Sequence, residues 1–156
     1  MHPLDIILGV GIGGARFGMI PAEVEAALDR PQDGTGWQDG DPRDWFLYPG
    51  FRLGFYGCSA ARPHPSGRLR ELIARPDPAV RLFGRSLGTW TKADSLDRCR
   101  REGYEPTRRV YEPVEAGIEE VGIGNEGFWL SIDFEADGQA GWLEMFSRRR
   151  SDDQSG

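Results

Sequence analysis

Two pairs of carboxylates in the C-terminal half of the chain have spacings that acid–base chemistry could use. Asp133 and Glu135 lie two residues apart, and Glu119 and Glu120 are neighbours. On a strand, side chains two residues apart point the same way, about 7 Å from each other, and such a pair could serve as acid and base. An enzyme would also need a pocket with further polar groups, and the sequence marks none. The same carboxylates could instead form a solvated sheet face or a surface that binds a partner.

These pairs belong to a longer acidic segment, from Tyr111 to Phe146, which contains nine carboxylates and no lysine, arginine or histidine. The same segment is rich in aromatic residues, including Trp129 and Trp142. A surface of one charge sign that also carries aromatic rings is well suited to docking on a basic partner. This is the most informative functional feature of the sequence.

The strand expected over 128–134 decides which acidic groups would share a surface. Every second residue from Phe128 to Phe134 is large and apolar, which predicts one buried face. The positions between them, with Trp129 and Asp133, then lie on the opposite face, and a tryptophan among charges is a recurrent composition at interface centres. The residues expected to bind a partner are Glu119, Glu120, Glu126, Trp129, Asp133, Glu135, Trp142 and Glu144.

Two alternatives would remove this surface. A helix could cover the face, which would make Trp129 a core residue. Basic residues could also neutralise the acidic segment from within the same molecule. The candidates for such internal pairing are Arg98, Arg100, Arg101, Arg108 and Arg109.

Two further motifs could carry chemistry. The segment 9–14 has the G-x-G-x-x-G spacing of dinucleotide sites, but such a site needs a helix to begin at once, and here the helix is expected only from Pro21. We interpret the segment as a glycine-rich turn and expect no cofactor. Cys58 and His64 could be a nucleophile and base or two metal ligands, but the further groups that such sites need are not marked. We expect no metal site and no catalytic residue.

The composition limits the partners and the compartment. The formal net charge is −6, which disfavours a broad nucleic-acid-binding surface. No stretch approaches the ~20 apolar residues of a membrane span, and the N-terminus lacks the regions of a signal peptide. We therefore expect a cytoplasmic protein in which Cys58 and Cys99 are reduced thiols, while a disulfide between them stays open. The sequence does not indicate an oligomeric state.

Two helices are expected. Pro21 suits the first position of a helix that ends before Pro31. A second helix is expected over 92–102, with Thr91 as its N-terminal cap and Gly103 after its end. Residues 32–44 and 57–67 are expected to form loops.

Strands fill most of the remaining chain, and the order of elements repeats. Strands are expected at 5–8, 45–48, 51–56, 68–74, 80–89, 107–112, 117–123, 128–134 and 142–146. One helix followed by several strands, twice over, predicts an α+β fold with antiparallel sheet. We interpret it as a tandem repeat of two similar helix-plus-antiparallel-sheet halves, 1–76 and 77–147, followed by a disordered tail over 148–156.

The segment 16–31 resembles a known pattern. It contains Gly-Met, three residues, Glu-Val, three residues, Leu, two residues and Pro, and it covers about a tenth of the chain. The matching residues are Gly18, Met19, Glu23, Val24, Leu28 and Pro31. The pattern is similar to the helical segment of the SmpA/OmlA outer-membrane lipoproteins and of proteins with a β-lactamase-inhibitor-like fold. Asp29 stands where glycine is usual, and Ile20 where a Ser or Thr cap is usual.

The resemblance implies a protein-binding scaffold rather than an enzyme, and a duplicated form of that fold packs two helix-plus-sheet units side by side. The lipoprotein and secreted-inhibitor branches are disfavoured, because neither a signal peptide nor a lipid-acceptor cysteine stands near the N-terminus. What remains resembles the acidic cytoplasmic immunity proteins that neutralise toxins exchanged between bacteria. Many such toxins act on nucleic acids or nucleotides and have basic active-site clefts.

We therefore expect a bacterial immunity protein that neutralises a cognate toxin by occluding it with an acidic, aromatic-bearing face. One alternative is a small hydrolase or transferase that uses paired carboxylates. Another is a structural or adaptor domain that binds protein.

Overall fold

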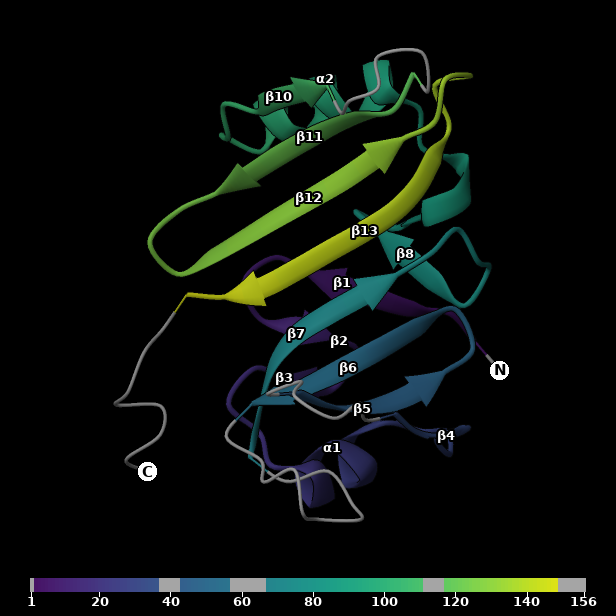
Figure 1. The fold of residues 1–156 in the computed structure, drawn as a ribbon, viewed down its shortest axis with the longest axis vertical. Helices are drawn as coiled ribbons and strands as arrows, with labels where there is room; N and C mark the ends of the chain where they lie inside the picture. Colours follow the sequence, from purple (N-terminus) through teal and green to yellow (C-terminus); the bar gives the residue numbers. More distant parts are fainter. Residues whose placement is uncertain (1, 37–42, 57–66, 111–116, 149–156) are drawn as a thin grey trace.

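The computed structural model describes residues 2–36, 43–56, 67–110 and 117–148 (Figure 1). The helices are α1 (Pro21–Ala27) and α2 (Lys92–Arg101), and a short 3-10 helix, η1, spans Leu87–Thr89. The strands are β1 (Leu4–Ile7), β2 (Gly11–Ile12), β3 (Ala15–Arg16), β4 (Gly34–Gly36), β5 (Arg43–Tyr48), β6 (Phe51–Tyr56), β7 (Arg68–Ala74), β8 (Val80–Leu82), β9 (Arg85–Ser86), β10 (Thr107–Val110), β11 (Glu119–Gly124), β12 (Phe128–Phe134) and β13 (Ala140–Ser147).

The strands form two sheets, so the fold is α+β with mostly antiparallel pairing. The large sheet has eight strands in the order β10-β11-β12-β13-β7-β6-β5-β4. The small sheet has five, in the order β3-β2-β1-β8-β9, and its β1–β8 pair is parallel. In the large sheet β7 and β13 are the central pair, with β6, β5 and β4 following on one side and β12, β11 and β10 on the other.

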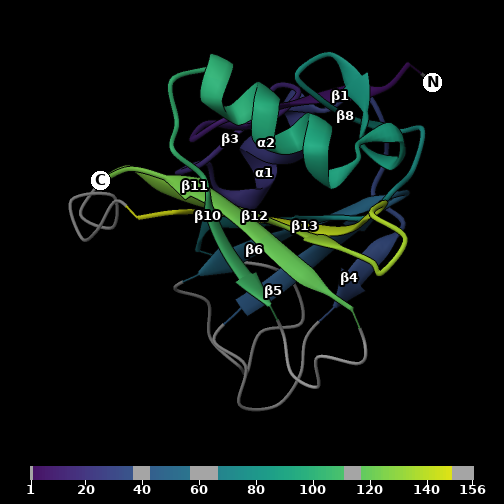
Figure 2. The ribbon, with the colours of Figure 1, turned by 90° about the horizontal axis from the view of Figure 1, so that it is seen from above.

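In the described parts of the chain, both helices and the small sheet pack on one face of the large sheet, with the core between them (Figure 2). Among the described residues, no helix or strand lies against the other side, which we call the open face. Core residues include Ile12, Val24, Phe46, Leu53, Leu72, Leu82, Cys99, Leu130, Leu143 and Met145. The open face includes Trp45, Arg52, Glu71, Ile73, Glu120, Trp129, Ser131, Asp133, Trp142, Glu144 and Phe146.

Both helices form where the sequence predicts them. Pro21 occupies the first turn of α1, and Glu23 accepts a hydrogen bond from the backbone N–H of Ile20 at 3.1 Å. Thr91 caps α2 by accepting a backbone N–H in the first turn at 3.2 Å. Gly103 follows α2 with a φ of +92°, the left-handed conformation in which glycine commonly ends a helix.

The apolar hairpins are also confirmed. The pair β5–β6 turns at the expected Pro-Gly dipeptide, and β7 and β12 have the predicted bounds. In β6, Phe51, Leu53 and Phe55 all lie in the core, as their alternation predicts. In β6 and β12, large apolar residues occupy every second position, so the sequence alone shows which face of each strand is buried.

Two predictions about connecting segments are wrong. The segment 32–44 is not wholly a loop, because β4 pairs with β5 through backbone groups and needs no apolar alternation. The segment 80–89 is not one extended strand, because the chain reverses at Phe83 and Gly84, with φ values of +52° and +76°. Nearly all of the expected loop 57–67 and of the tail 148–156 lies outside the described residues. No helix in the described parts is long and apolar enough to cross a membrane.

The centre of the large sheet should govern stability. Leu143 in β13 is fully buried, so L143A is expected to lower the free energy of unfolding by about 2–5 kcal/mol through lost contacts and a cavity. The matched control is V110A on the edge strand β10, where the side chain is 54% exposed and the expected change is within about 0.5 kcal/mol. Urea denaturation measures both, and equal losses for the two variants would contradict this packing.

Candidate functional site

The strand β12 divides its side chains between the two faces as the sequence predicts. Burial alternates along it without exception from Phe128 to Phe134. Trp129, Ser131 and Asp133 are half-buried on the open face. Glu135 follows the end of the strand and is exposed.

Three acidic side chains meet at one end of this hairpin. Asp133 pairs in register with Glu120 on β11 and with Trp142 on β13. The carboxylate of Glu135 lies directly over Gly141, where a Cβ would collide with its Oε1. We call Glu120, Asp133 and Glu135, together with the adjoining Trp142, the acidic corner.

The surroundings of Asp133 in the acidic corner disfavour its ionised form. Burial raises the pKa of the Asp133 carboxyl, and the like charges of Glu120 and Glu135 raise it further. Within the described residues, no ion pair or hydrogen bond engages the side chain of Asp133 or Glu135. A carboxylate in such surroundings is less stable ionised than it would be in water.

Glu119 is placed differently from its neighbour Glu120. It shares the inward parity of Val121 and Ile123 and faces α2, with only 13% of its side chain exposed. Lys92 Nζ and Arg108 Nε donate to its two carboxylate oxygens, each at 2.7 Å. Hydrogen bonds from Arg108 and then Lys92 lower the pKa of Glu119. The structure therefore places Glu119 away from the open face, and internal neutralisation holds for this carboxylate.

The two candidate tryptophans differ in accessibility. The indole of Trp129 lies on Gly122 and Gly124 of β11, where any Cβ would collide with it. The guanidinium of Arg148 covers the same ring at 5.3 Å from its centroid. Trp142, by contrast, is 39% exposed. Trp142 is therefore the more accessible aromatic anchor on the open face.

The remaining candidates lie apart from the acidic corner. Glu126 is exposed in the turn between β11 and β12, at the other end of a strand about 20 Å long. Glu144 is half-buried in the middle of the open face, between Ser131 and Ile73 in register. The eight expected residues are thus not one site, and four of them, Glu120, Asp133, Glu135 and Trp142, come together.

Most of the arginines on and near α2 form ion pairs with carboxylates that lie outside the acidic segment. Arg98 pairs with Glu102 at 2.9 Å, and Arg101 with Asp97. These pairs join residues four apart on the same helix, where they add little stability. Neither of these pairs involves Asp133 or Glu135.

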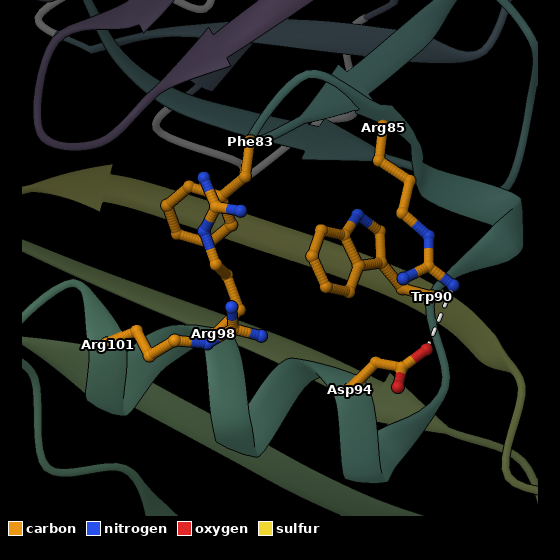
Figure 3. Close-up of a pocket in the computed structure, with 6 residues that line it drawn as sticks. All are labelled: Phe83, Arg85, Trp90, Asp94, Arg98 and Arg101. Carbon is orange, nitrogen blue, oxygen red and sulfur yellow. Dashed lines mark hydrogen bonds and ion pairs between the residues drawn. The ribbon is translucent and has the colours of Figure 1, made fainter.

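A small hollow of about 140 Å³ lies between the β8–β9 turn and α2 (Figure 3). In its walls, two guanidiniums lie over aromatic rings. The guanidinium of Arg85 lies 4.5 Å from the centroid of the Trp90 ring, and that of Arg98 lies 5.0 Å from the centroid of the Phe83 ring. Arg85 also binds Asp94 at 3.0 Å. Each of these arginines already forms an ion pair with a carboxylate. We therefore interpret the cluster as a packing contact that joins α2 to the β8–β9 hairpin. The sequence analysis missed it, since it depends on the unpredicted turn at Phe83.

The described residues give no support for a site at the other candidate motifs. The glycine-rich segment belongs to β2 and the turns beside it, and α1 begins only at Pro21, as the turn interpretation predicts. Cys99 is a buried free thiol whose pKa is raised by burial. Cys58 and His64 lie outside the described residues, and within those described no cluster of three or more potential metal ligands occurs.

Comparison of the chain with protein-family models, with curated proteins and with solved structures found no match.

The Glu119 ion pairs predict a pH-dependent contribution to stability. Because the pKa of Glu119 is lowered in the folded protein, its stabilisation is complete above the usual pKa of glutamate and is lost as the pH falls through the folded value. E119Q is therefore expected to be less stable than the wild type by about 1–3 kcal/mol at pH 7, with the difference vanishing in acid. Thermal or urea unfolding across the acid range measures it.

The matched control is E126Q, since Glu126 is exposed in a turn and has no ion pair among the described residues. Its difference from the wild type should stay small at every pH. A loss for E119Q that is the same at pH 7 and at pH 2 would show that the ion pairs are not its source.

Proposed function

We propose that this chain is a bacterial immunity protein, which binds a cognate toxin and covers a basic surface on it with the acidic corner. The observation that carries the proposal is Asp133, a half-buried carboxylate with a raised pKa, two acidic neighbours and no cationic partner among the described residues. Ionised at neutral pH, this group destabilises the free protein. A cationic partner would remove that cost on binding.

Trp142 gives the proposed surface its anchor. It is exposed beside Asp133, and tryptophan is among the residues that contribute most to interface affinity when a partner buries them. The carboxylates around it would accelerate encounter with a basic protein and orient it. The mechanism is therefore electrostatic steering followed by burial of the indole.

We also propose that the fold is a tandem repeat. The support is the arrangement of the large sheet, in which β4–β7 and β10–β13 run outward from the β7–β13 pair in mirrored order. The parallel β1–β8 pair joins the first strands of the two halves, and each half has one helix. The proposed boundary near residue 76 lies between β7 and β8.

A second candidate function is a small hydrolase or transferase. The raised pKa of the Asp133 carboxyl favours it, because perturbed pKa values are common among catalytic groups. Neither of the hollows at the β8–β9 turn and beside Trp142 is lined by a carboxylate of the acidic corner. An enzyme would need a converging pocket at this point. A half-buried carboxylate on a sheet, next to the exposed ring of Trp142, instead favours binding.

The direct test is neutralisation in cells. The proposal predicts a toxin domain encoded next to this chain and places the complex in the cytoplasm. Co-expression should restore the growth that the toxin alone stops. Continued growth arrest, with both proteins present in soluble form, would overturn the proposal.

Removing the charges of Asp133 and Glu135 should weaken binding of the toxin without lowering the stability of the free protein. D133N/E135Q is expected to weaken toxin binding by about tenfold or more. It should leave the free protein at least as stable as the wild type at pH 7, because the raised pKa of Asp133 means that its ionisation opposes folding there. The stability gain should disappear as the pH falls below the usual range of aspartate.

Calorimetric titration of the toxin and urea unfolding measure the two effects, with E126Q as the control that removes a carboxylate outside the acidic corner. An affinity equal to that of the wild type would remove the acidic corner from the interface. A parallel loss of stability and affinity would assign Asp133 and Glu135 a structural role instead.

Steering predicts a salt-dependent association rate. Raising the ionic strength from about 0.01 M to about 1 M should slow association by at least about tenfold, while dissociation changes less. Stopped-flow fluorescence of Trp142 against a W142F control can follow the reaction. A rate that does not vary with salt would refute the steering step.

A further inference from the structure

A second feature of the open face lies on the other side of Trp142 from the acidic corner. A hollow of about 360 Å³ opens there over β5, β6 and β7. Its walls include Asp33, Leu47, Arg52, Ile73, Arg75 and Trp142. A volume of this order can hold a side chain from a partner.

Arg52 is the unusual residue of this hollow. Its guanidinium lies 4.5 Å from the centroid of the Trp45 ring and 5.8 Å from that of Trp142. Its Nε is buried, and no group in the described parts of the chain accepts the hydrogen bond that this atom can donate. Among the described residues, no carboxylate or carbonyl pairs with any part of the Arg52 guanidinium.

An unsatisfied buried donor is costly, and native proteins rarely retain one without a reason. The two tryptophan rings hold the Arg52 guanidinium in place on the open face, so that little conformational freedom would be lost when an acceptor arrives. Arg81, by contrast, has an acceptor for its guanidinium, because it donates two hydrogen bonds of 2.9 Å each to the carboxylate of Asp5.

The chemistry of the hollow selects a carboxylate as the missing acceptor. A guanidinium presents parallel donors that match the two oxygens of a carboxylate. The walls carry two guanidiniums, from Arg52 and Arg75, against the single carboxylate of Asp33. The aromatic and aliphatic walls limit the water that would weaken such a pair.

We propose that this hollow is a recognition pocket for a carboxylate side chain, Asp or Glu, presented by the protein that docks on the open face. The inference rests on the proposed function in taking the open face as the docking surface. It adds that the partner must present an acidic side chain within reach of Trp142, next to the basic surface that meets the acidic corner. Such an alternation of charge fixes the orientation of the complex and rejects uniformly basic proteins.

The test uses the whole chain labelled with ¹⁵N-arginine and follows the Arg52 Nε–H resonance by NMR. The probes are two blocked peptides, acetyl-Gly-Glu-Gly-amide and acetyl-Gly-Gln-Gly-amide, which differ in charge and hardly in shape. The Glu peptide is expected to shift the Arg52 resonance in a saturable manner, with an affinity at least about tenfold above that of the Gln peptide. Equal shifts with both peptides, or none with either, would overturn the proposal.

Three variants distinguish the effects of donor geometry, charge and folding. Each is uniformly labelled with ¹⁵N, and binding is measured on the backbone amides of the residues that line the hollow. R52K keeps the positive charge but loses the planar donors, and is expected to weaken binding of the Glu peptide by about tenfold. W142A removes one wall and should also weaken it. R100Q, at an exposed arginine on α2, is the matched control and should bind like the wild type. Unchanged binding in R52K would assign the effect to charge alone and contradict the proposed geometry.

A second copy of the chain is the competing occupant, since it too carries exposed carboxylates. Light scattering of the free protein decides this point, and a monomer is expected. Self-association that R52K abolishes would overturn the proposal of a separate partner. Because neither measurement uses a toxin, their failure leaves the neutralisation experiment intact, and failure of that experiment leaves peptide binding at Arg52 intact.

Discussion

The packing of one face of the large sheet constrains everything that the other face can present. Leu130 and Ile132 of β12 must lie in the core against the helices and the small sheet. Because a strand alternates its side chains, Ser131 and Asp133 are then forced onto the open face. A register slip of one residue would bury the carboxylate and expose the leucine, at a cost that excludes it. The position of the acidic corner therefore follows from the core.

The acidic segment divides into a structural part and a part that remains available. Glu119 faces inward and links α2 to β10 through Lys92 and Arg108. Asp133 and Glu135 face outward without an internal cation among the described residues. Stability alone would favour a neutral side chain at position 133, because the pKa of the Asp133 carboxyl is raised by burial and by its acidic neighbours. Charge is retained there beside an exposed tryptophan and beside Arg52, whose Nε has no acceptor among the described residues. The proposed partner would meet both groups on this face.

Sequence reasoning succeeded where apolar residues alternate over a full strand or a helix has a marked start, as in β12 and at Pro21. It failed where backbone pairing alone makes a strand, as in β4, and where Phe83 adopts a left-handed conformation. The inward position of Glu119 could have been read from its parity with Val121 and Ile123. The contact of Arg52 with Trp142 could not, because it depends on the order of strands in the sheet, which local patterns do not encode.

The central claim is that Asp133 stays uncompensated on the open face of the free protein. Titration of the Asp133 side-chain carboxyl by ¹³C NMR, assigned with D133N, tests it without any partner. The account predicts a pKa above the usual value for aspartate, because burial and the charges of Glu120 and Glu135 disfavour ionisation. A pKa below that value would show that a cation within the protein already neutralises the group, and would contradict the account.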